Sequence, residues 1–91
     1  MKYDIVLKNQ TNVSIDFLLF SNETKKEFKN QILNNSKKII SYEKEGFVGF
    51  SEMSLFTKGI LIKKIEVYGG NIINIIKKDS KIHVEISYPD F

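Results

Sequence analysis

The most informative segment of the sequence is ILIKKIEVYGGNIINIIKK, residues 60–78. Two runs rich in Ile and Val meet there at Gly69-Gly70, and a Gly-Gly pair supplies the positive φ that a tight two-residue hairpin turn requires. We therefore expect the two runs to fold back on each other as a β-hairpin. Both faces of that hairpin are largely apolar: one carries Ile65, Val67, Ile72 and Ile76, and the other carries Tyr68, Ile73 and Ile75. A ribbon that is apolar on both faces must be covered on both, which predicts a place in the middle of a sheet, beneath a second layer or against a partner chain.

Alternating apolar and polar residues predict further strands on either side of this stretch. The expected strands cover residues 3–8, 13–20, 37–43 and 82–88, and a Gly-interrupted aromatic segment covers 45–57. We expect the first two strands to form an opening hairpin, and Asp79-Ser80 to form the turn before the last strand. Within residues 60–67 the apolar parity changes across Lys63-Lys64, which predicts a β-bulge there.

Residues 24–34 fit two interpretations. Thr24 and Glu27 have capping-box spacing, and Phe28 and Ile32 stand one helical turn apart, which favours one short helix. The competing interpretation is two short strand fragments joined by a loop. The fold class that follows is mainly β: a predominantly antiparallel sheet of six or seven strands, rolled into a sandwich or barrel or backed by that helix.

Length and composition indicate one small domain, residues 1–91, with a single modest core. Cys is absent, so disulfides and Cys-based metal sites are excluded. The N-terminal residues MKYDIVLKNQ contain only three consecutive apolar residues, so we expect no signal peptide and a cytoplasmic location, or host cytoplasm if a phage encodes the chain. Ile, Lys and Asn make up 36 of the 91 residues, and Ala and Arg are missing, as in the AT-rich genomes of low-GC bacteria, their phages and mobile elements.

Catalytic and metal-binding chemistries have little support in the sequence. His83 is the only His, and the alternation of residues 82–88 turns it outward, away from any dry cleft that a general base needs. One His without Cys cannot furnish a structural zinc site, and Gly69-Gly70 lacks the following Lys-Ser or Lys-Thr of a phosphate-binding loop. We therefore expect a non-enzymatic protein with no metal and no cofactor.

One motif resembles a known family. Tyr42, Glu43, Phe47 and Gly49 follow the Y-E-x-x-x-F-x-G pattern of a βγ-crystallin Greek key, and Ile65, Val67 and Gly70 are similar to the last strand of such a key. The resemblance covers at most 40 residues and implies a structural domain in which the aromatic pair folds over as a corner and the Gly adopts a backbone conformation closed to other residues. It does not imply calcium binding, because Lys63-Lys64 stand where the calcium-binding members carry Ser or Thr.

Protein binding is the function that the sequence favours. The segment after residue 45 is unusually apolar and is flanked by Glu43, Glu45 and Glu52, and an aromatic and Met-rich surface inside a charged rim is typical of an interface hot spot. The expected partner-binding residues are Phe47, Phe50, Met53, Leu55 and Phe56; for each of them a place in the core is the alternative. We expect a domain that occupies a surface of another protein, as an inhibitor of phage or mobile-element type would, and that forms a homodimer through an uncovered face or edge strand.

Nonspecific nucleic-acid binding is the alternative function. It rests on the net charge of +3 and on Lys-rich segments near aromatic residues, which single-strand binders combine. The lysines concerned are Lys25, Lys26, Lys29, Lys37, Lys38, Lys63 and Lys64. The absence of Arg counts against it, because Lys cannot make the bidentate and stacked contacts of a guanidinium group.

Overall fold

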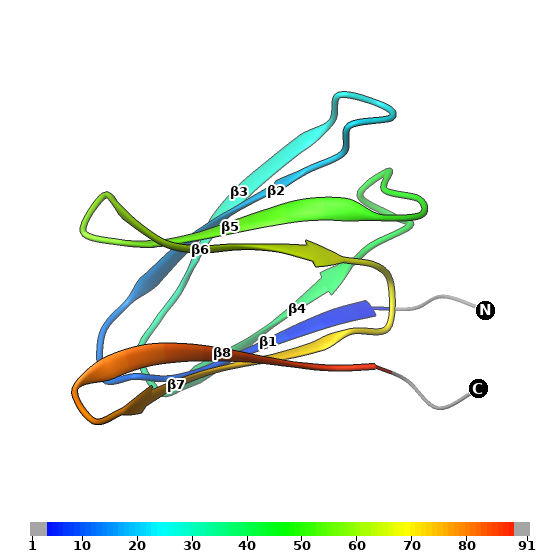
Figure 1. Cartoon of the computed structure of the whole chain (residues 1–91). Coiled ribbons are helices and arrows are strands. Elements are labelled where there is room, and N and C mark those ends of the chain that lie inside the picture. The colour runs from blue at the N-terminus through cyan, green and yellow to red at the C-terminus, as the bar shows by residue number, and fades with distance from the viewer. Residues whose placement is uncertain (1–3, 89–91) are drawn as a thin grey trace.

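The structure, a computed structural model, describes residues 4–88 as eight strands without a helix. The strands are β1 (Asp4–Gln10), β2 (Ile15–Phe20), β3 (Glu27–Ile32), β4 (Ser36–Ser41), β5 (Ser51–Thr57), β6 (Ile60–Val67), β7 (Ile72–Lys78) and β8 (Lys81–Ser87). They form two four-stranded sheets that lie one above the other in Figure 1. Sheet A has the order β4-β1-β7-β8, and sheet B has the order β3-β2-β5-β6. The mainly β, sandwich-like prediction is confirmed, whereas the prediction of six or seven strands in one sheet is wrong.

The Gly69-Gly70 turn is present, but the hairpin predicted around it is not. Gly70 has a φ of 98°, and the Tyr68 N–H donates to Oδ1 of Asn71 at 2.8 Å while the Asn71 N–H donates back to the Tyr68 carbonyl at 3.2 Å. The chain leaves sheet B at this turn and enters sheet A, where β7 pairs in parallel with β1. A turn fixes how sharply the chain reverses, but it does not fix which strand lies beside the next one, because strand pairing depends on distant partners.

Because β6 and β7 belong to different sheets, the two apolar faces predicted for one hairpin lie elsewhere. Ile65 and Val67 are buried on the inner face of sheet B, and Ile73 and Ile75 are buried on the inner face of sheet A. Ile72 lies on the outer face of sheet A and is 37% exposed, so the prediction of an Ile-rich ribbon covered on both faces is wrong. The expected opening hairpin is also wrong, since β1 and β2 lie in opposite sheets.

Residues 24–34 contain strand β3 rather than a helix. Phe28 and Ile32 are four residues apart, and a spacing of four fits the period of two in a strand as well as one turn of a helix. In the structure β3 pairs antiparallel with β2, so that Phe28 lies opposite Leu19 and Ile32 opposite Ile15. Inward-facing partners on β2 therefore decide the outcome, and the predicted short helix is wrong.

The predicted bulge in β6 is confirmed, displaced by one residue. Leu55 pairs with Lys63 and Phe56 pairs with Leu61, which leaves Ile62 as the extra residue. This shift restores Ile65 to the core-facing side of sheet B.

The sandwich is tied together along one side and open along the other. On the tied side, β3 runs directly into β4 through a turn in which Asn35 has a φ of 54°. The buried Asn9 side chain holds this side, because its Nδ2 donates to the carbonyls of Val13 at 2.7 Å and Ile32 at 3.0 Å. The opposite side is bordered by the edge strands β6 and β8.

Candidate functional site

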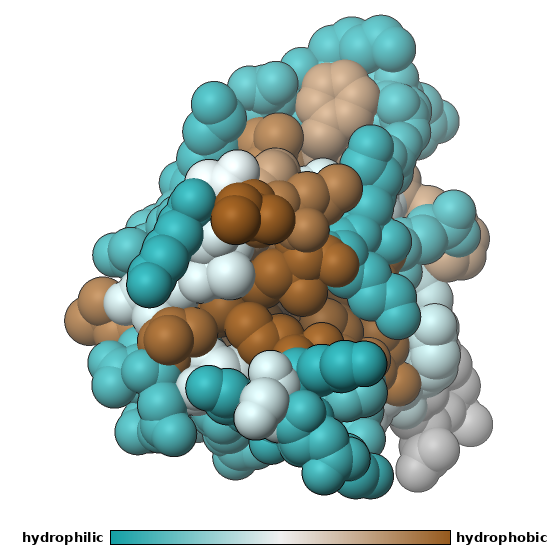
Figure 2. Space-filling view, turned by 60° about the vertical axis from the view of Figure 1, so that its left-hand side comes forward, coloured by the Kyte–Doolittle hydropathy of each residue, from teal (hydrophilic) through white to brown (hydrophobic). Residues whose placement is uncertain are grey.

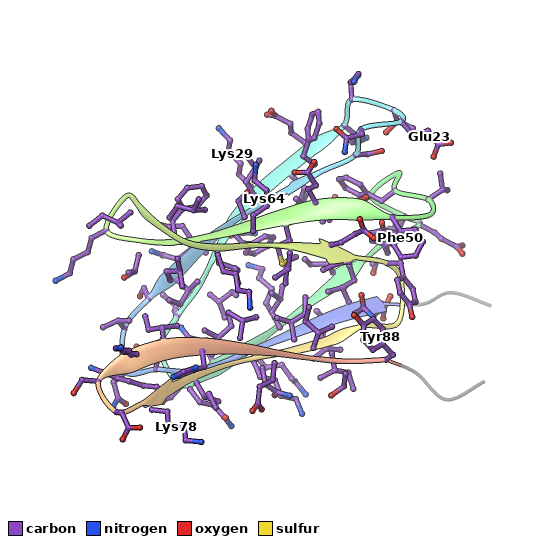
Figure 3. All side chains as sticks on the ribbon, in the orientation of Figure 1. Glu23, Lys29, Phe50, Lys64, Lys78 and Tyr88 are labelled. Carbon is purple, nitrogen blue, oxygen red and sulfur yellow. The ribbon has the colours of Figure 1, made fainter. Side chains whose placement is uncertain are left out.

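Three aromatic rings that follow or precede strands of both sheets meet at one end of the sandwich. Phe50 immediately precedes β5, Tyr68 follows β6, and Tyr88 follows β8. The Phe50 and Tyr68 rings make an edge-to-face contact with centroids 5.1 Å apart, and the Tyr68 and Tyr88 rings stack with centroids 5.6 Å apart. Figure 3 shows Phe50 and Tyr88 on the same end of the molecule, one beside each sheet. We call these three residues the aromatic stack.

Much of the aromatic stack faces solvent. Phe50 is 61% exposed and Tyr88 is 57% exposed, and the neighbouring Val48 is 54% exposed. Large apolar side chains that are this exposed and lie close together are uncommon on a protein surface unless they form an interaction site. A shallow cavity of about 340 Å³ lies beside the stack; it is lined by Tyr42, Glu43, Phe47, Val48, Gly49, Tyr68 and Gly69.

The loop that presents Phe50 is fixed by the buried side chain of Tyr42. Its ring stacks on that of Phe47 with centroids 5.5 Å apart, and its hydroxyl lies 2.7 Å from both the Gly49 carbonyl and the Ser51 hydroxyl. Burial raises the pKa of Tyr42, and the hydrogen bond with Ser51 opposes that shift. The β4–β5 loop is therefore held by defined contacts, so Phe50 is presented from a supported position.

A second apolar surface lies along the open side of the sandwich. Its members are half-buried and pack against the core from β6 and β8; they are Ile62, Ile82, Val84 and Ile86. We call them the open edge. Figure 2 shows an apolar band between the two sheets, bordered above and below by hydrophilic side chains.

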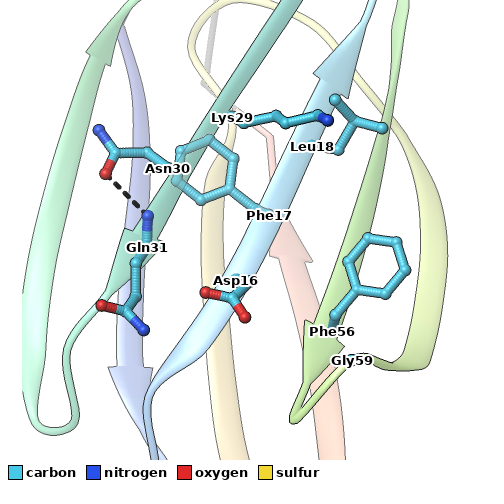
Figure 4. A pocket seen from close by; sticks show the side chains of 8 residues that line it. All are labelled: Asp16, Phe17, Leu18, Lys29, Asn30, Gln31, Phe56 and Gly59. Atoms are coloured by element: carbon cyan, nitrogen blue, oxygen red, sulfur yellow. Dashed lines mark hydrogen bonds between the residues drawn. The ribbon is translucent and has the colours of Figure 1, made fainter.

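A hollow of about 680 Å³ lies on β2, β3 and β5 of sheet B and is open to solvent (Figure 4). It combines apolar residues such as Leu18 and Phe56 with Asp16 and Lys29. Two of its lining residues are joined by a hydrogen bond, which the Gln31 N–H donates to Oδ1 of Asn30 at 2.8 Å. This mixed and shallow surface has no convergent set of polar groups of the kind that orients a small ligand.

The five residues predicted to bind a partner differ in their burial. Phe47, Met53 and Leu55 are fully buried in the core and are not available to a partner in this fold. Phe50 is exposed, and Phe56 is half-buried on the outer face of sheet B. Sequence reasoning did not assign Tyr68 and Tyr88 to this site, because the contact between their rings depends on how strands from opposite sheets end side by side.

The seven lysines of the nucleic-acid alternative are distributed over both sheets and do not form one surface. Lys29 and Lys64 lie on the outer face of sheet B, in register with Leu18 and Ser54, whereas Lys37 lies on the outer face of sheet A. Lys38 and Lys63 are in register with core residues of their sheets, and Lys25 and Lys26 lie in the β2–β3 connection.

Two of these lysines lie close to neighbouring groups on sheet B or its loops. Lys64 Nζ is 3.6 Å from Glu52. The pKa of the Glu52 carboxyl is lowered, mainly because Asn22 donates a hydrogen bond to it; burial opposes this shift, and the charge of Lys64 adds to it. Lys25 Nζ lies 6.0 Å from the centre of the Phe20 ring.

The residues considered for catalysis and metal binding do not converge. His83 is exposed on the outer face of β8, as its position in the alternation predicted. Within residues 4–88, no group of three or more His, Cys, Asp or Glu side chains comes together in a way that could hold a metal ion. The described part of the chain also holds no helix that could span a bilayer.

Part of the local geometry expected from the βγ-crystallin resemblance is present, because the Tyr42 and Phe47 rings stack at 25°. Gly49 has a φ of 65°, but Lys25 and Ser80 have φ angles of 60° and 62°, so its φ is not one that is closed to other residues. The resemblance does not extend to the whole chain. In comparisons with known proteins, no family model matches the sequence, and no curated protein and no solved structure gives a significant match.

Proposed function

We propose that this chain is a small, non-enzymatic protein-binding domain that acts by occupying a surface of a partner protein, with the aromatic stack as the centre of its contact surface. The observation that carries the proposal is the exposure of Phe50 and Tyr88 on a supported end of the sandwich. Tyr and Phe are enriched at interfaces because each brings a large, rigid contact area for little loss of conformational freedom.

The surroundings of the stack fit this role. Val48 extends the apolar surface, and the shallow cavity beside it is largely apolar with Glu43 at its border. A central apolar group inside a polar rim lets a partner exclude water from the contacts that contribute most to affinity. The expectation of an inhibitor of phage or mobile-element type, acting in the cytoplasm, is part of this proposal and rests on size and composition.

Site-specific photo-crosslinking tests the proposal. Phe50 is replaced by p-benzoylphenylalanine in one version of the chain, and Ile39 is replaced in a control version. Ile39 is a matched control because it is 55% exposed but lies on the outer face of sheet A, away from the stack. We expect one discrete adduct from a lysate of the source organism with the crosslinker at residue 50 and none with it at residue 39.

The captured protein is then purified and its affinity measured. The Phe50→Ser variant should bind at least about tenfold more weakly than the natural chain, as truncation of a hot-spot aromatic residue does, and Ile39→Ser should bind equally well. Equal adducts at both positions, or unchanged affinity of Phe50→Ser, would overturn the proposal.

A further inference from the structure

The two sheets have four edge strands, and these edges are not equally protected. An edge strand presents backbone N–H and C=O groups that can pair with another strand, and proteins usually guard such edges with bulges, with Lys or with inward-pointing polar residues. The edges here are β4 and β8 in sheet A, and β3 and β6 in sheet B.

Three of the edges carry such features. Strand β6 has its bulge at Ile62 and places Lys63 on the same side as the buried Leu55. Strand β4 places Lys38 opposite the buried Leu7, and β3 places Asn30 opposite the buried Phe17. In each case a polar or charged residue occupies a position on the core-facing side, where an added strand would have to cover it.

Strand β8 begins with Lys81 but has no bulge and no inward-pointing polar residue. Its register with β7 is unbroken from Ser87, opposite Ile72, to Lys81, opposite Lys78. Every core-facing residue within it is apolar and half-buried; these are Ile82, Val84 and Ile86. An additional strand beside β8 would therefore find a straight edge and an apolar inner side.

The sequence of β8 is complementary to itself. In an antiparallel pair of two β8 strands with a twofold axis at Val84, every residue from Lys81 to Ser87 has a partner. On the outer face, His83 lies opposite Glu85 of the second copy, and the same pair recurs across the axis. On the inner face, Ile82 lies opposite Ile86 of the second copy, and the two Val84 residues lie opposite each other. An imidazole N–H can donate a hydrogen bond to a carboxylate in a facing position, and facing apolar pairs stabilise antiparallel strands.

From this edge we propose that two copies of the chain pair through β8, joining their A sheets into one continuous sheet with a twofold axis at Val84. Because the axis is perpendicular to the sheet, the inner faces of both copies are on the same side. The open edges then face each other, so that the half-buried residues of each copy lie against those of the other. The interface is isologous, and each copy contributes the same strand.

Analytical ultracentrifugation of a charge series tests this inference, since His83 and Glu85 are both exposed and their substitution leaves the core intact. The natural chain should form dimers at micromolar concentration. His83→Glu places two carboxylates opposite each other on both sides of the axis, and it should raise the dimer dissociation constant by about tenfold or more. The double variant with His83→Glu and Glu85→Lys places a carboxylate opposite an ammonium group in this register and should dimerise again.

The register is tested by the same double variant. If the axis were at His83 instead, Lys81 would lie opposite residue 85 of the second copy. In the double variant both of these positions carry Lys, so the variant would stay monomeric. Glu66→Lys is the control, because Glu66 is exposed on the outer face of the other open-side strand, β6, and its substitution should leave dimerisation unchanged. A natural chain that remains monomeric at high micromolar concentration, or a dimer that does not respond to His83→Glu, would overturn the inference. Neither result bears on crosslinking from residue 50, so the two proposals fail separately.

Discussion

Tyr42 is the single residue on which the presentation of the aromatic stack depends most. Its ring is buried, and its hydroxyl connects the carbonyl of Gly49 with the side chain of Ser51, on either side of Phe50. When a buried hydroxyl with two hydrogen-bond partners is removed, both partners lose that hydrogen bond.

We expect Tyr42→Phe to lower the free energy of unfolding by about 1–2 kcal/mol, because it removes one buried hydroxyl and leaves the Gly49 carbonyl and the Ser51 hydroxyl without this partner. Urea denaturation followed by circular dichroism measures the change. Ser51→Ala is the matched variant, since it removes only one of the two contacts, and it should cost less than Tyr42→Phe. An unchanged unfolding midpoint for Tyr42→Phe would show that the hydroxyl does not hold the loop.

The effect of Tyr42→Phe on the free energy of unfolding should depend on pH. Burial raises the pKa of Tyr42, so the unfolded chain loses this proton at about pH 10 while the folded chain keeps it to higher pH. The folded state then binds more protons than the unfolded state, and the free energy of unfolding falls as the pH rises above about 10. The stability difference between the natural chain and Tyr42→Phe should therefore be constant below that pH and should shrink above it.

At the level of single residues, the sequence allowed part of the site to be predicted. Phe50 was named as a binding residue and is exposed, whereas Met53 and Leu55 were named with it and are buried. Parity separates them: Met53 and Leu55 share one face of β5 with the buried Ser51, while Phe50 precedes the strand. The contribution of Tyr68 and Tyr88 requires knowledge of which strands end side by side, and no local pattern contains that information.

At the scale of elements, local alternation predicted the strands well but not their neighbours. The strands predicted for residues 13–20 and 82–88 correspond closely to β2 and β8. The pairing of β7 with β1 in parallel was not predictable, because a period of two determines which residues face the core and not which strand lies alongside. The β3 segment was ambiguous because a spacing of four residues suits both a helix and a strand.

The turn between β7 and β8 was predicted and is confirmed. Asp79 and Ser80 have φ angles of 52° and 62°, the two positive values that a type I′ hairpin turn requires. Both are residues for which this conformation carries a steric cost, and Ser lacks the tolerance of Gly or Asn.

We therefore expect Ser80→Gly to raise the free energy of unfolding by about 0.5–1 kcal/mol, because Gly adopts a positive φ without that cost. Thermal denaturation measures the change. The control is Ser87→Gly at the other end of β8, where the backbone is extended and Gly should destabilise the strand. Destabilisation by Ser80→Gly would contradict a type I′ turn at this position.

At the scale of the whole molecule, one crossing of the chain determines where the surfaces lie. Because β6 and β7 go to opposite sheets, β8 becomes the outer strand of sheet A, β6 becomes the outer strand of sheet B, and Tyr68 and Tyr88 end next to each other. A hairpin of β6 and β7 would place these strands in one sheet, and neither the open edge nor the aromatic stack would exist in this form. The crossing at Gly69-Gly70 therefore creates both surfaces, and the proposed function and the proposed dimer both depend on it.

The most direct test is disulfide trapping in this Cys-free chain. Lys8 and Asn74 are direct partners in the parallel β1–β7 pair, about 5 Å apart as neighbouring strands are, which is within reach of a disulfide. Ile65 and Asn74 would be partners in a hairpin centred on Gly69-Gly70, but they lie in opposite sheets, about 10 Å or more apart, and cannot be bridged. Under mild oxidation of the monomer, Lys8→Cys with Asn74→Cys should form an intramolecular disulfide, and Ile65→Cys with Asn74→Cys should not. The reverse outcome would contradict the crossing and the surfaces that follow from it.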